Sequence, residues 1–429
     1  GECHRGRSPP GTLENSGWYV GAMSTPSHRV TFTGSNGQQL AGRLDLPATP
    51  PTAMALFAHC FTCSKDLFAA GRIAAELMAA GIGVLRFDFA GLGASEGDFE
   101  QTDFSSNQTD LLAAADWLRA NHSAPQLLIG HSLGGAAVIS VAGSIPEVRA
   151  VATIAAPADA AHVTTLFTDE LPAIAAEGCR YVQIGDRTFP IRQAFVDDLL
   201  RHSVEERVAT MRAPLLVMHS PIDNTVGVEN AARLFTAARH PKSFVSLDGA
   251  DHLLSRREDA VFAAQIIATW AQRYLVAEHA PLPVPAPTAP VVVAETGLGT
   301  FLNHVVAGDH RWLADEPVDV GGFDAGPSPY DMLAAALGAC TSMTMRMYAQ
   351  RKQLALRRVT VEVRHQKRHA DDCADCVDGK GALTDHFDRH LVIEGELSDA
   401  DRQSLVKIAD RCPVHRTLEA GSRIVTTVG

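Results

Sequence analysis

The stretch Gly130-His131-Ser132-Leu133-Gly134 decides the fold of the first half of this chain. An apolar run, residues 127–129, comes directly before it, and small apolar residues with helical character, 135–139, follow. In a strand, Gly-x-Ser-x-Gly, helix arrangement the small residues let the chain turn so sharply that the serine side chain is exposed at the top of the sheet. The stretch therefore predicts a nucleophilic serine at the end of a buried strand.

Length and composition limit the classes of protein to consider. The chain has 429 residues, enough for about two to three domains. Its net charge of −12 argues against nucleic acid or an anionic membrane surface as a partner. No apolar stretch approaches the roughly 18–20 residues of a membrane span. Eight cysteines are too few for a disulfide scaffold, and their spacing suits a reducing cytoplasm, where we expect the protein to reside.

Prolines mark where the chain divides. Alternating prolines favour an extended spacer, and five of them lie close together: Pro281, Pro283, Pro285, Pro287 and Pro290. Residues 277–291 are therefore predicted to link a first domain, 27–276, to a second domain, 292–429. Residues 1–26 lack the apolar core of a signal peptide and are predicted to be a disordered leader or residues added at cloning, since Met23 resembles a natural start.

Short apolar runs alternate with helical patterns in the first domain. Such alternation predicts an α/β fold, with a mostly parallel, doubly wound sheet that is covered on both faces. An antiparallel hairpin that turns at Asn36-Gly37 is expected to open the sheet. The predicted strands are 53–58, 83–87, 126–129, 150–154, 215–218 and 243–247, and the predicted helices lie near 67–80, 103–121, 133–143, 227–238 and 257–275.

Two further residues complete a catalytic triad with Ser132. Serine needs a base to remove its proton and a carboxylate to orient that base. Asp223 follows a late strand, and His252 lies on a glycine-containing loop after the next strand. Asp248 and Asp251 are rival acids, but Asp251 adjoins His252 and is poorly placed to bend back to it. We therefore predict Ser132, Asp223 and His252 as the catalytic residues.

With these motifs in this order, residues 27–276 resemble the α/β-hydrolase superfamily. The resemblance implies acyl transfer, but it does not choose between ester, thioester and amide substrates. A serine carboxylesterase acting on small or medium acyl esters is the expected activity, without a cofactor. The resemblance also implies a cap near 158–208, in which four aromatic residues either contact substrate or hold the cap on the core: Phe167, Tyr181, Phe189 and Phe195.

The oxyanion of the reaction needs two backbone N–H donors. One is expected from Leu133, directly after the nucleophile, and the other from Phe61 in the loop after the strand 53–58. That loop contains Cys60 and Cys63 in a C-x-x-C pattern. A redox or zinc role lacks a second ligand pair nearby, so local packing of the two thiols beside the active site is the favoured interpretation.

The second domain combines short strands with one long apolar helix. The run Gly326-Pro327-Ser328-Pro329-Tyr330-Asp331 starts that helix, which extends to Met345 and is apolar enough to be buried on all sides. Strands are expected at 290–294, 301–306, 359–366, 390–395 and 423–428, and a second helix at 399–411.

The stretch from Gly326 to Thr341, together with Arg411-Cys412-Pro413-Val414-His415-Arg416, resembles the OsmC/organic hydroperoxide resistance family. The resemblance covers about 292–429 and implies an α+β domain, an intertwined homodimer and thiol-dependent reduction of organic hydroperoxides. It makes Cys340 the peroxidatic cysteine and Cys412 the resolving cysteine, which an external thiol later reduces. An acid and an arginine would support the thiolate, and Asp331 and Arg311 are the candidates.

A weaker pattern lies between two strands of this domain. His365 and His369 precede Cys373 and Cys376 with spacing that can hold zinc, although unpaired surface thiols are an equal alternative. No metal is therefore assigned.

Three functions follow for the whole chain. The first is an esterase, the second a bifunctional esterase and thiol peroxidase, and the third an esterase whose second domain only pairs two copies. The expected partners are a small ester, an external thiol if the peroxidase is active, and a second copy of the chain.

Overall fold

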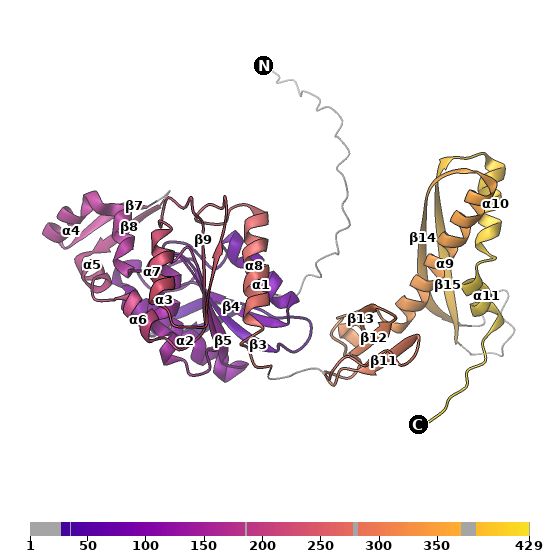
Figure 1. The fold of residues 1–429 in the computed structure, drawn as a ribbon, viewed down its shortest axis with the longest axis horizontal. Helices are drawn as coiled ribbons and strands as arrows, with labels where there is room; N and C mark the ends of the chain where they lie inside the picture. Colours follow the sequence, from indigo (N-terminus) through magenta and orange to yellow (C-terminus); the bar gives the residue numbers. More distant parts are fainter. Residues whose placement is uncertain (1–26, 35, 185–186, 278–281, 370–382, 429) are drawn as a thin grey trace, which may run out of the picture. The chain divides into compact units, whose positions relative to one another are not determined.

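The computed structural model describes residues 27–428 apart from four internal gaps, at 35, 185–186, 278–281 and 370–382. The chain divides into two compact units, Gly1–Ala280 and Pro281–Gly429, each with its own hydrophobic core (Figure 1). The predicted leader, and the part of the predicted linker at 278–281, lie outside the described residues. Among the described residues, no helix combines the length and the apolar character needed to cross a bilayer.

An eight-stranded sheet forms the centre of the described part of the first unit. Its strand order is β1-β2-β4-β3-β5-β6-β9-β10. The pairs β1–β2 and β2–β4 are antiparallel, and the remaining pairs are parallel. The strands are β1 (Ser27–Thr33), β2 (Gln39–Asp45), β3 (Ala53–Ala58), β4 (Ile82–Phe87), β5 (Pro125–His131), β6 (Ala150–Ile154), β9 (Leu215–His219) and β10 (Lys242–Ser246). The fold is therefore the predicted mostly parallel α/β sheet.

Helices cover both faces of this sheet because its central strands are apolar on both sides. Every residue of β3 is buried: Ala55 and Phe57 pack with α1 and α8, while Leu56 and Ala58 pack on the opposite face. This alternation follows from the two-residue period of a strand. The helices of this layered core are α1 (Phe68–Ala79), α2 (Phe104–Asn121), α3 (Leu133–Val141), α7 (Glu229–Ala237) and α8 (Arg257–Ala271).

A cap is inserted between β6 and β9. It contains the hairpin of β7 (Cys179–Ile184) and β8 (Arg187–Arg192), flanked by η3 (Ala160–Glu170), α4 (Leu171–Glu177), α5 (Gln193–Leu199) and α6 (Val204–Thr210). Phe189 and Phe195 are buried and contact Phe99 beneath the cap, with ring centroids 4.9 and 6.5 Å away. Phe167 is also buried, but Tyr181 is 70% exposed. Three of the four aromatic candidates therefore hold the cap in place.

The second unit contains two small sheets and three helices among its described residues. One sheet pairs β11 (Val291–Glu295), β12 (Asn303–Ala307) and β13 (His310–Ala314); the other pairs β14 (Ala355–His369) with β15 (Leu383–Glu396). The helices are α9 (Pro329–Lys352), α10 (Asp399–Ala409) and α11 (Pro413–Ala420). Ser328 and Asp331 form a capping box at the start of α9, as its Ser-Pro beginning suggests.

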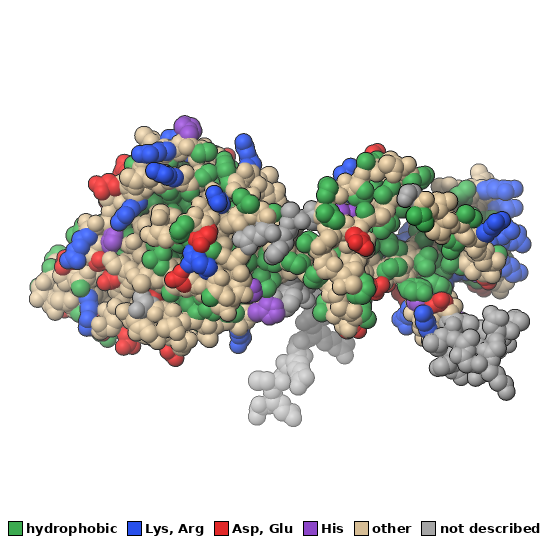
Figure 2. All heavy atoms as spheres, turned by 90° about the horizontal axis from the view of Figure 1, so that it is seen from below, with side chains coloured by type: hydrophobic (Ala, Val, Ile, Leu, Met, Phe, Trp, Pro, Cys, Tyr) green, Lys and Arg blue, Asp and Glu red, His purple; other side chains and the backbone are tan. Residues whose placement is uncertain are grey.

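Two expectations for this unit were wrong. Helix α9 is not buried on all sides, because only one side is covered by β14, α10 and α11; Leu333, Met343 and Met347 are exposed. Residues 423–428 form no strand, since no described strand pairs with them and Ile424 and Val428 lie in solvent. Figure 2 shows hydrophobic side chains over much of the visible surface of this unit.

Candidate active site

Ser132 lies at a sharp turn between β5 and α3. Its backbone φ of 54° and ψ of −124° fall outside the regions that non-glycine residues usually occupy. Two glycines make the turn possible: a Cβ on Gly130 would collide with the carbonyl of Gly134, and a Cβ on Gly134 would collide with the carbonyls of Ala58 and His59. The start of α3 therefore lies tightly against the loop after β3, which brings Ser132 close to that loop.

Asp223 and His252 come from loops after neighbouring strands and meet directly. His252 Nδ1 lies 2.7 Å from Asp223 Oδ2, while Asp223 Oδ1 accepts the backbone N–H groups of Thr225 and Val226 at 2.8 and 2.9 Å. Burial by itself would raise the pKa of Asp223, but the hydrogen bond from His252 and the two N–H groups outweigh it and hold this pKa below 3.8. Asp223 is therefore a carboxylate that orients His252.

Two further histidines hold the loops that carry Asp223 and His252. His131 Nε2 donates to the carbonyl of His252 at 2.7 Å, and His219 Nε2 donates to the carbonyl of Val226 at 2.7 Å. Both rings are buried, and burial is the main reason that each pKa is lowered, for His131 to about 4. Both are therefore neutral near pH 7. The sequence predicts a structural role for His131. It does not single out His219, because nothing in the neighbouring residues distinguishes this histidine from the others.

The predicted oxyanion donors flank one cavity. Phe61 and Leu133 line it together with Ser132 and His252, and its volume is about 370 Å³. Among the described residues, neither the Phe61 N–H nor the Leu133 N–H forms a hydrogen bond. Two donors on this cavity therefore stay available to a ligand. Ser132 and His252 both line this cavity.

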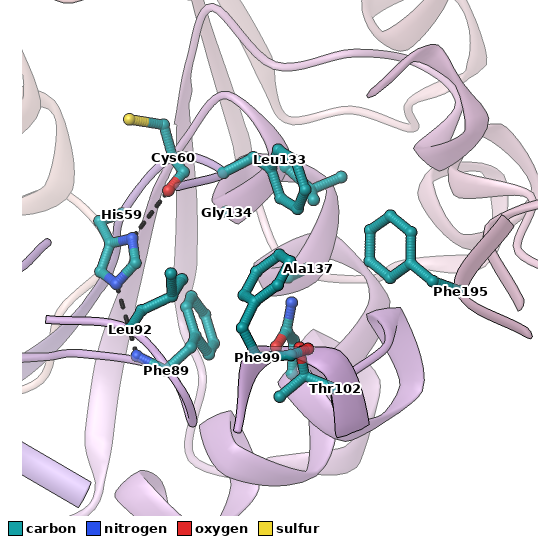
Figure 3. Close-up of a pocket in the computed structure, with 12 residues that line it drawn as sticks. His59, Cys60, Phe89, Leu92, Phe99, Thr102, Leu133, Gly134, Ala137 and Phe195 are labelled. Carbon is teal, nitrogen blue, oxygen red and sulfur yellow. Dashed lines mark hydrogen bonds between the residues drawn. The ribbon is translucent and has the colours of Figure 1, made fainter. Parts of the chain in front are cut away.

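The loop that carries Phe61 is held by His59. His59 Nδ1 donates to the carbonyl of Cys60 at 2.8 Å, and His59 Nε2 accepts the Phe89 N–H at 3.4 Å (Figure 3). The ring of Phe61 also stacks on Phe195 of the cap, with centroids 5.6 Å apart. A second cavity of only about 10 Å³ lies beneath this loop, so the space under it is filled by side chains.

Cys60 and Cys63 form a disulfide, with Cα atoms 5.3 Å apart. Both cysteines line the cavity beside Ser132, as expected, but they are bonded to each other, which was not predicted from the sequence. The bond closes a small ring that contains Phe61 and Thr62, and Thr62 has a positive φ of 65°. A C-x-x-C pattern also fits a free thiol pair, and the turn that brings the two sulfurs together depends on how the loop packs.

In the second unit, Cys412 lies at the N-terminus of α11 beside Cys340 of α9. Its Sγ accepts the His415 N–H at 3.3 Å and lies 3.7 Å from the Thr341 hydroxyl, and the Cys340 side chain is within hydrogen-bonding reach. Burial raises the pKa of Cys412, but these hydrogen bonds and the positive charge of Arg389 outweigh it, so this pKa lies below 9.0. The two cysteines singled out from sequence are thus brought together.

The residues expected to support the thiolate lie elsewhere. Arg311 is on β13, and Asp331 accepts hydrogen bonds from Ser328 at the start of α9. The cation near Cys412 is instead Arg389 of β15, which donates to the Thr341 hydroxyl at 3.0 Å and to Asp410 at 2.6 Å. Arg389 lies 23 positions before Cys412 in sequence on a different element, so spacing alone does not connect them.

The residues that the structure describes give no support to a zinc site in this unit. Cys373 and Cys376 lie outside the described residues. His365 stacks on Tyr330 at 4.0 Å and its Nε2 bonds Asp385 at 2.9 Å. Within the described residues, no group of three or more metal-type ligands comes together.

Comparisons with known proteins establish the family. A family model described as the alpha/beta hydrolase family matches residues 55–320, and one described as OsmC-like protein matches residues 322–427. The first match spans more than half of the 429 residues, so the chain belongs to the alpha/beta hydrolase family. An OsmC-like domain follows in the same chain, as the sequence motifs predicted.

The individual relatives named here have low sequence identity to this chain or match only part of it. The chain is 25% identical over 240 residues to the uncharacterized protein YfhR of Salmonella typhi, covering 54% of this chain and 77% of that protein. It is 25% identical over 151 residues to the human mitochondrial palmitoyl-protein thioesterase ABHD10, covering 33% of this chain and 47% of that protein. Among solved structures it is similar to the esterase domain of a Rhodothermus marinus protein, with 51% identity, 58% of this chain and 99% of that chain covered, and a TM-score of 0.49.

Proposed function

We propose that the first unit is a serine carboxylesterase that hydrolyses small or medium acyl esters. The observation that carries this proposal is the 2.7 Å bond between His252 and Asp223 on the cavity that Ser132 lines. A hydrolase is the class of enzyme that the family defines, and a nucleophile, a base and an orienting acid are the groups that ester hydrolysis needs.

Each residue has a defined step in this reaction. Ser132 Oγ attacks the ester carbonyl while His252 Nε2 takes its proton, and Asp223 stabilises the resulting imidazolium. The N–H groups of Phe61 and Leu133 donate to the oxyanion. His252 then gives the proton to the leaving alkoxide, and the acyl group remains on Ser132. Water, activated by His252, releases the acid in the second half of the reaction.

The cavity supports a substrate of limited size. Its volume of about 370 Å³ lies near the lower end of the ~300–1,000 Å³ common for small-molecule sites. Leu133, Val163, Leu166 and Val226 are among its lining residues, and these apolar side chains suit an acyl chain.

Replacing the nucleophile tests the proposal. We expect Ser132→Ala to lower kcat for p-nitrophenyl butyrate by at least about a thousandfold, since the acyl intermediate cannot form. Ser140→Ala, on the same helix, is the matched control because its hydroxyl bonds only the Ala136 carbonyl among the described residues. Full activity of Ser132→Ala would refute the proposal. Comparing the butyryl oxygen ester with the matched thioester decides between an esterase and the thioesterase activity for which the human relative is named.

We infer a second candidate function, thiol-dependent hydroperoxide reduction, for the second unit. Its support is the contact between Cys340 and Cys412 and the lowered pKa of Cys412. One thiolate attacks the terminal oxygen of the hydroperoxide, the O–O bond breaks, and the alkoxide takes up a proton and leaves as an alcohol, so that the cysteine becomes a sulfenic acid. The other thiol then displaces this hydroxyl group as water and forms a disulfide. An external dithiol then reduces the disulfide.

Hydroperoxide consumption tests this second candidate. With tert-butyl hydroperoxide and excess dithiothreitol, we expect turnover by the wild type and loss of turnover in Cys340→Ser and in Cys412→Ser. Cys179→Ser in the first unit is the control, since Cys179 is a free cysteine on the cap strand β7. Equal rates in all four proteins would leave the second unit without this activity.

A homodimer through the second unit is part of the proposal. The exposed side of α9 carries Met343 and Met347, which are 65% and 69% exposed, and Leu333. Large apolar side chains along one helix side favour burial against a partner, and the family resemblance implies a second copy. Light scattering of Met343→Lys/Met347→Lys should show monomers where the wild type is a dimer, because the lysines would have to be buried.

A further inference from the structure

The cavity lined by Ser132 and His252 has one side chain with a permanent charge among its described lining residues. Among the described residues that line it, there is no carboxylate, and Arg187 is the sole lysine or arginine. Arg187 is the first residue of β8 in the cap, so its position depends on the cap rather than on the sheet. A single cation on the wall of a cavity with many apolar lining residues is a candidate for recognising charge in a ligand.

The structure orients this guanidinium without neutralising it. Arg187 Nη1 donates to the Thr62 carbonyl at 3.2 Å, and Arg187 Cζ lies 4.9 Å from the centre of the Phe189 ring. Both contacts direct the side chain, but neither carries a full negative charge. Because a guanidinium has five N–H donors, most of them stay available after the bond to Thr62.

The other arginines of the same hairpin behave differently. Arg180 pairs with Glu170 and Glu177, and Arg192 pairs with Glu100 at 2.7 Å. In the described part of the chain, Arg187 forms no ion pair with a carboxylate. Among the described residues, carboxylates therefore pair with the two arginines of the hairpin that do not line the cavity, whereas none pairs with Arg187.

We propose that Arg187 binds a carboxylate carried by the substrate, so that the preferred esters are anionic. This inference rests on the proposed esterase and names its substrate class. A planar guanidinium matches a carboxylate with two parallel hydrogen bonds, while the neutral acyl segment occupies the apolar wall. Two positions of this carboxylate fit the proposal: on the acyl group, as in a monoester of a dicarboxylic acid, or on the leaving alcohol. Both kinds of ester carry the negative charge that Arg187 would bind.

Matched pairs of esters test the proposal. The first pair is p-nitrophenyl hexanoate and the p-nitrophenyl monoester of adipic acid, which have the same chain length but differ by a terminal carboxylate. The second pair is phenyl hexanoate and 4-carboxyphenyl hexanoate, which places the charge on the leaving group. The kinetic constants are compared for the wild type, Arg187→Met, Arg187→Lys and the control Arg180→Met, all in the full chain.

We expect Arg187→Met to lower kcat/KM by about tenfold for the anionic member of one pair, mainly through KM, because a charge-assisted hydrogen bond is lost. The neutral member should change less than twofold, which also shows that the variant is folded. Arg187→Lys should recover part of the loss, and Arg180→Met should leave both members unchanged. The effect should shrink at high ionic strength, since Arg187 is exposed to solvent.

Equal effects of Arg187→Met on both members of both pairs would overturn the proposal, as would an equal loss in Arg180→Met. If the wild type hydrolyses no ester, the proposed esterase fails, and Arg187 is still tested by binding. Calorimetry with monomethyl adipate then compares Ser132→Ala with Ser132→Ala/Arg187→Met. At least tenfold weaker binding by the double variant supports the carboxylate site, and equal affinity rejects it.

Discussion

The serine turn of the first unit and the pair of thiols in the second unit have different surroundings. Ser132 is held by a strained turn between buried elements, and the proposed esterase also needs His252 and Asp223, which are supplied by loops after neighbouring strands. Cys412 sits at a helix start and acquires thiolate character from N–H and hydroxyl groups and from Arg389. The serine needs a proton acceptor at one defined atom, whereas the cysteine needs only a more positive environment. The first arrangement should therefore tolerate substitution much less than the second.

The largest expected effect is at the orienting acid. Asp223→Asn places an amide where His252 Nδ1 donates, which favours the wrong tautomer of His252. We expect kcat for p-nitrophenyl butyrate to fall by about a thousandfold. Asp251→Asn is the control, because Asp251 Oδ1 accepts the Ser255 N–H instead. A loss below tenfold would mean that the serine site is as tolerant as the cysteine site.

The next effect concerns stability and pH. Because burial lowers the pKa of His131 to about 4 in the folded unit, while an unfolded histidine titrates near ~6.5, the unfolded chain binds more protons between these values. The free energy of unfolding should therefore fall as the pH drops below ~6.5, by about 2 kcal/mol between pH 7 and pH 5, until the loss is complete below ~4.

Urea unfolding of the wild type and of His131→Gln at both pH values measures this contribution. The glutamine amide can still donate to the His252 carbonyl but does not titrate. We expect the difference in free energy of unfolding between pH 7 and pH 5 to shrink in the variant. The same pH dependence in both proteins would assign it to other groups.

A smaller effect is expected from the Cys60–Cys63 bond. Reduction of the Cys60–Cys63 bond by a dithiol opens the ring around Phe61, which loosens one proposed oxyanion donor. We therefore expect kcat for p-nitrophenyl butyrate to fall about fivefold after this treatment. Cys60→Ser/Cys63→Ser should show the lower rate from the start and should not respond to the dithiol. An unchanged wild-type rate, with reduction verified by mass spectrometry after alkylation, would show that His59 and Phe195 hold the loop without the disulfide.

The smallest effect is expected at the cysteine site. Arg389→Met removes a positive charge near Cys412 and should raise its pKa, so the pH profile of tert-butyl hydroperoxide consumption should move to higher pH. At pH 7 we expect about a threefold loss of this activity. Arg357→Met, an exposed arginine paired with Glu394, is the control. A loss as large as that of Asp223→Asn in the esterase would remove the contrast between the two sites.

Much of the first unit could be predicted from sequence because its pattern is local. Fully apolar runs identify β3 and β5, and the glycines around Ser132 identify the turn. The position of Asp223 directly after a strand favoured it over Asp248 and Asp251, which also precede His252, and the structure places Asp223 Oδ2 against His252 Nδ1. The start of α9 could also be predicted from a local pattern, its Ser-Pro beginning. Its burial on all sides could not, because composition does not say how many sides of a helix are covered by other elements.

By itself, the sequence determined the α/β class, the position of the serine turn, the strands of the central sheet and the OsmC-like motif. Only the tertiary structure decided that Cys60 bonds Cys63, that His131 and His219 hold the catalytic loops, that Arg389 replaces Arg311 beside the thiols, and that Arg187 lines the cavity without an acidic partner in the described chain. Periodicity and steric limits act between near neighbours in the chain, so they can be read locally. Hydrogen bonds and charge pairing depend on which distant elements the packing brings together.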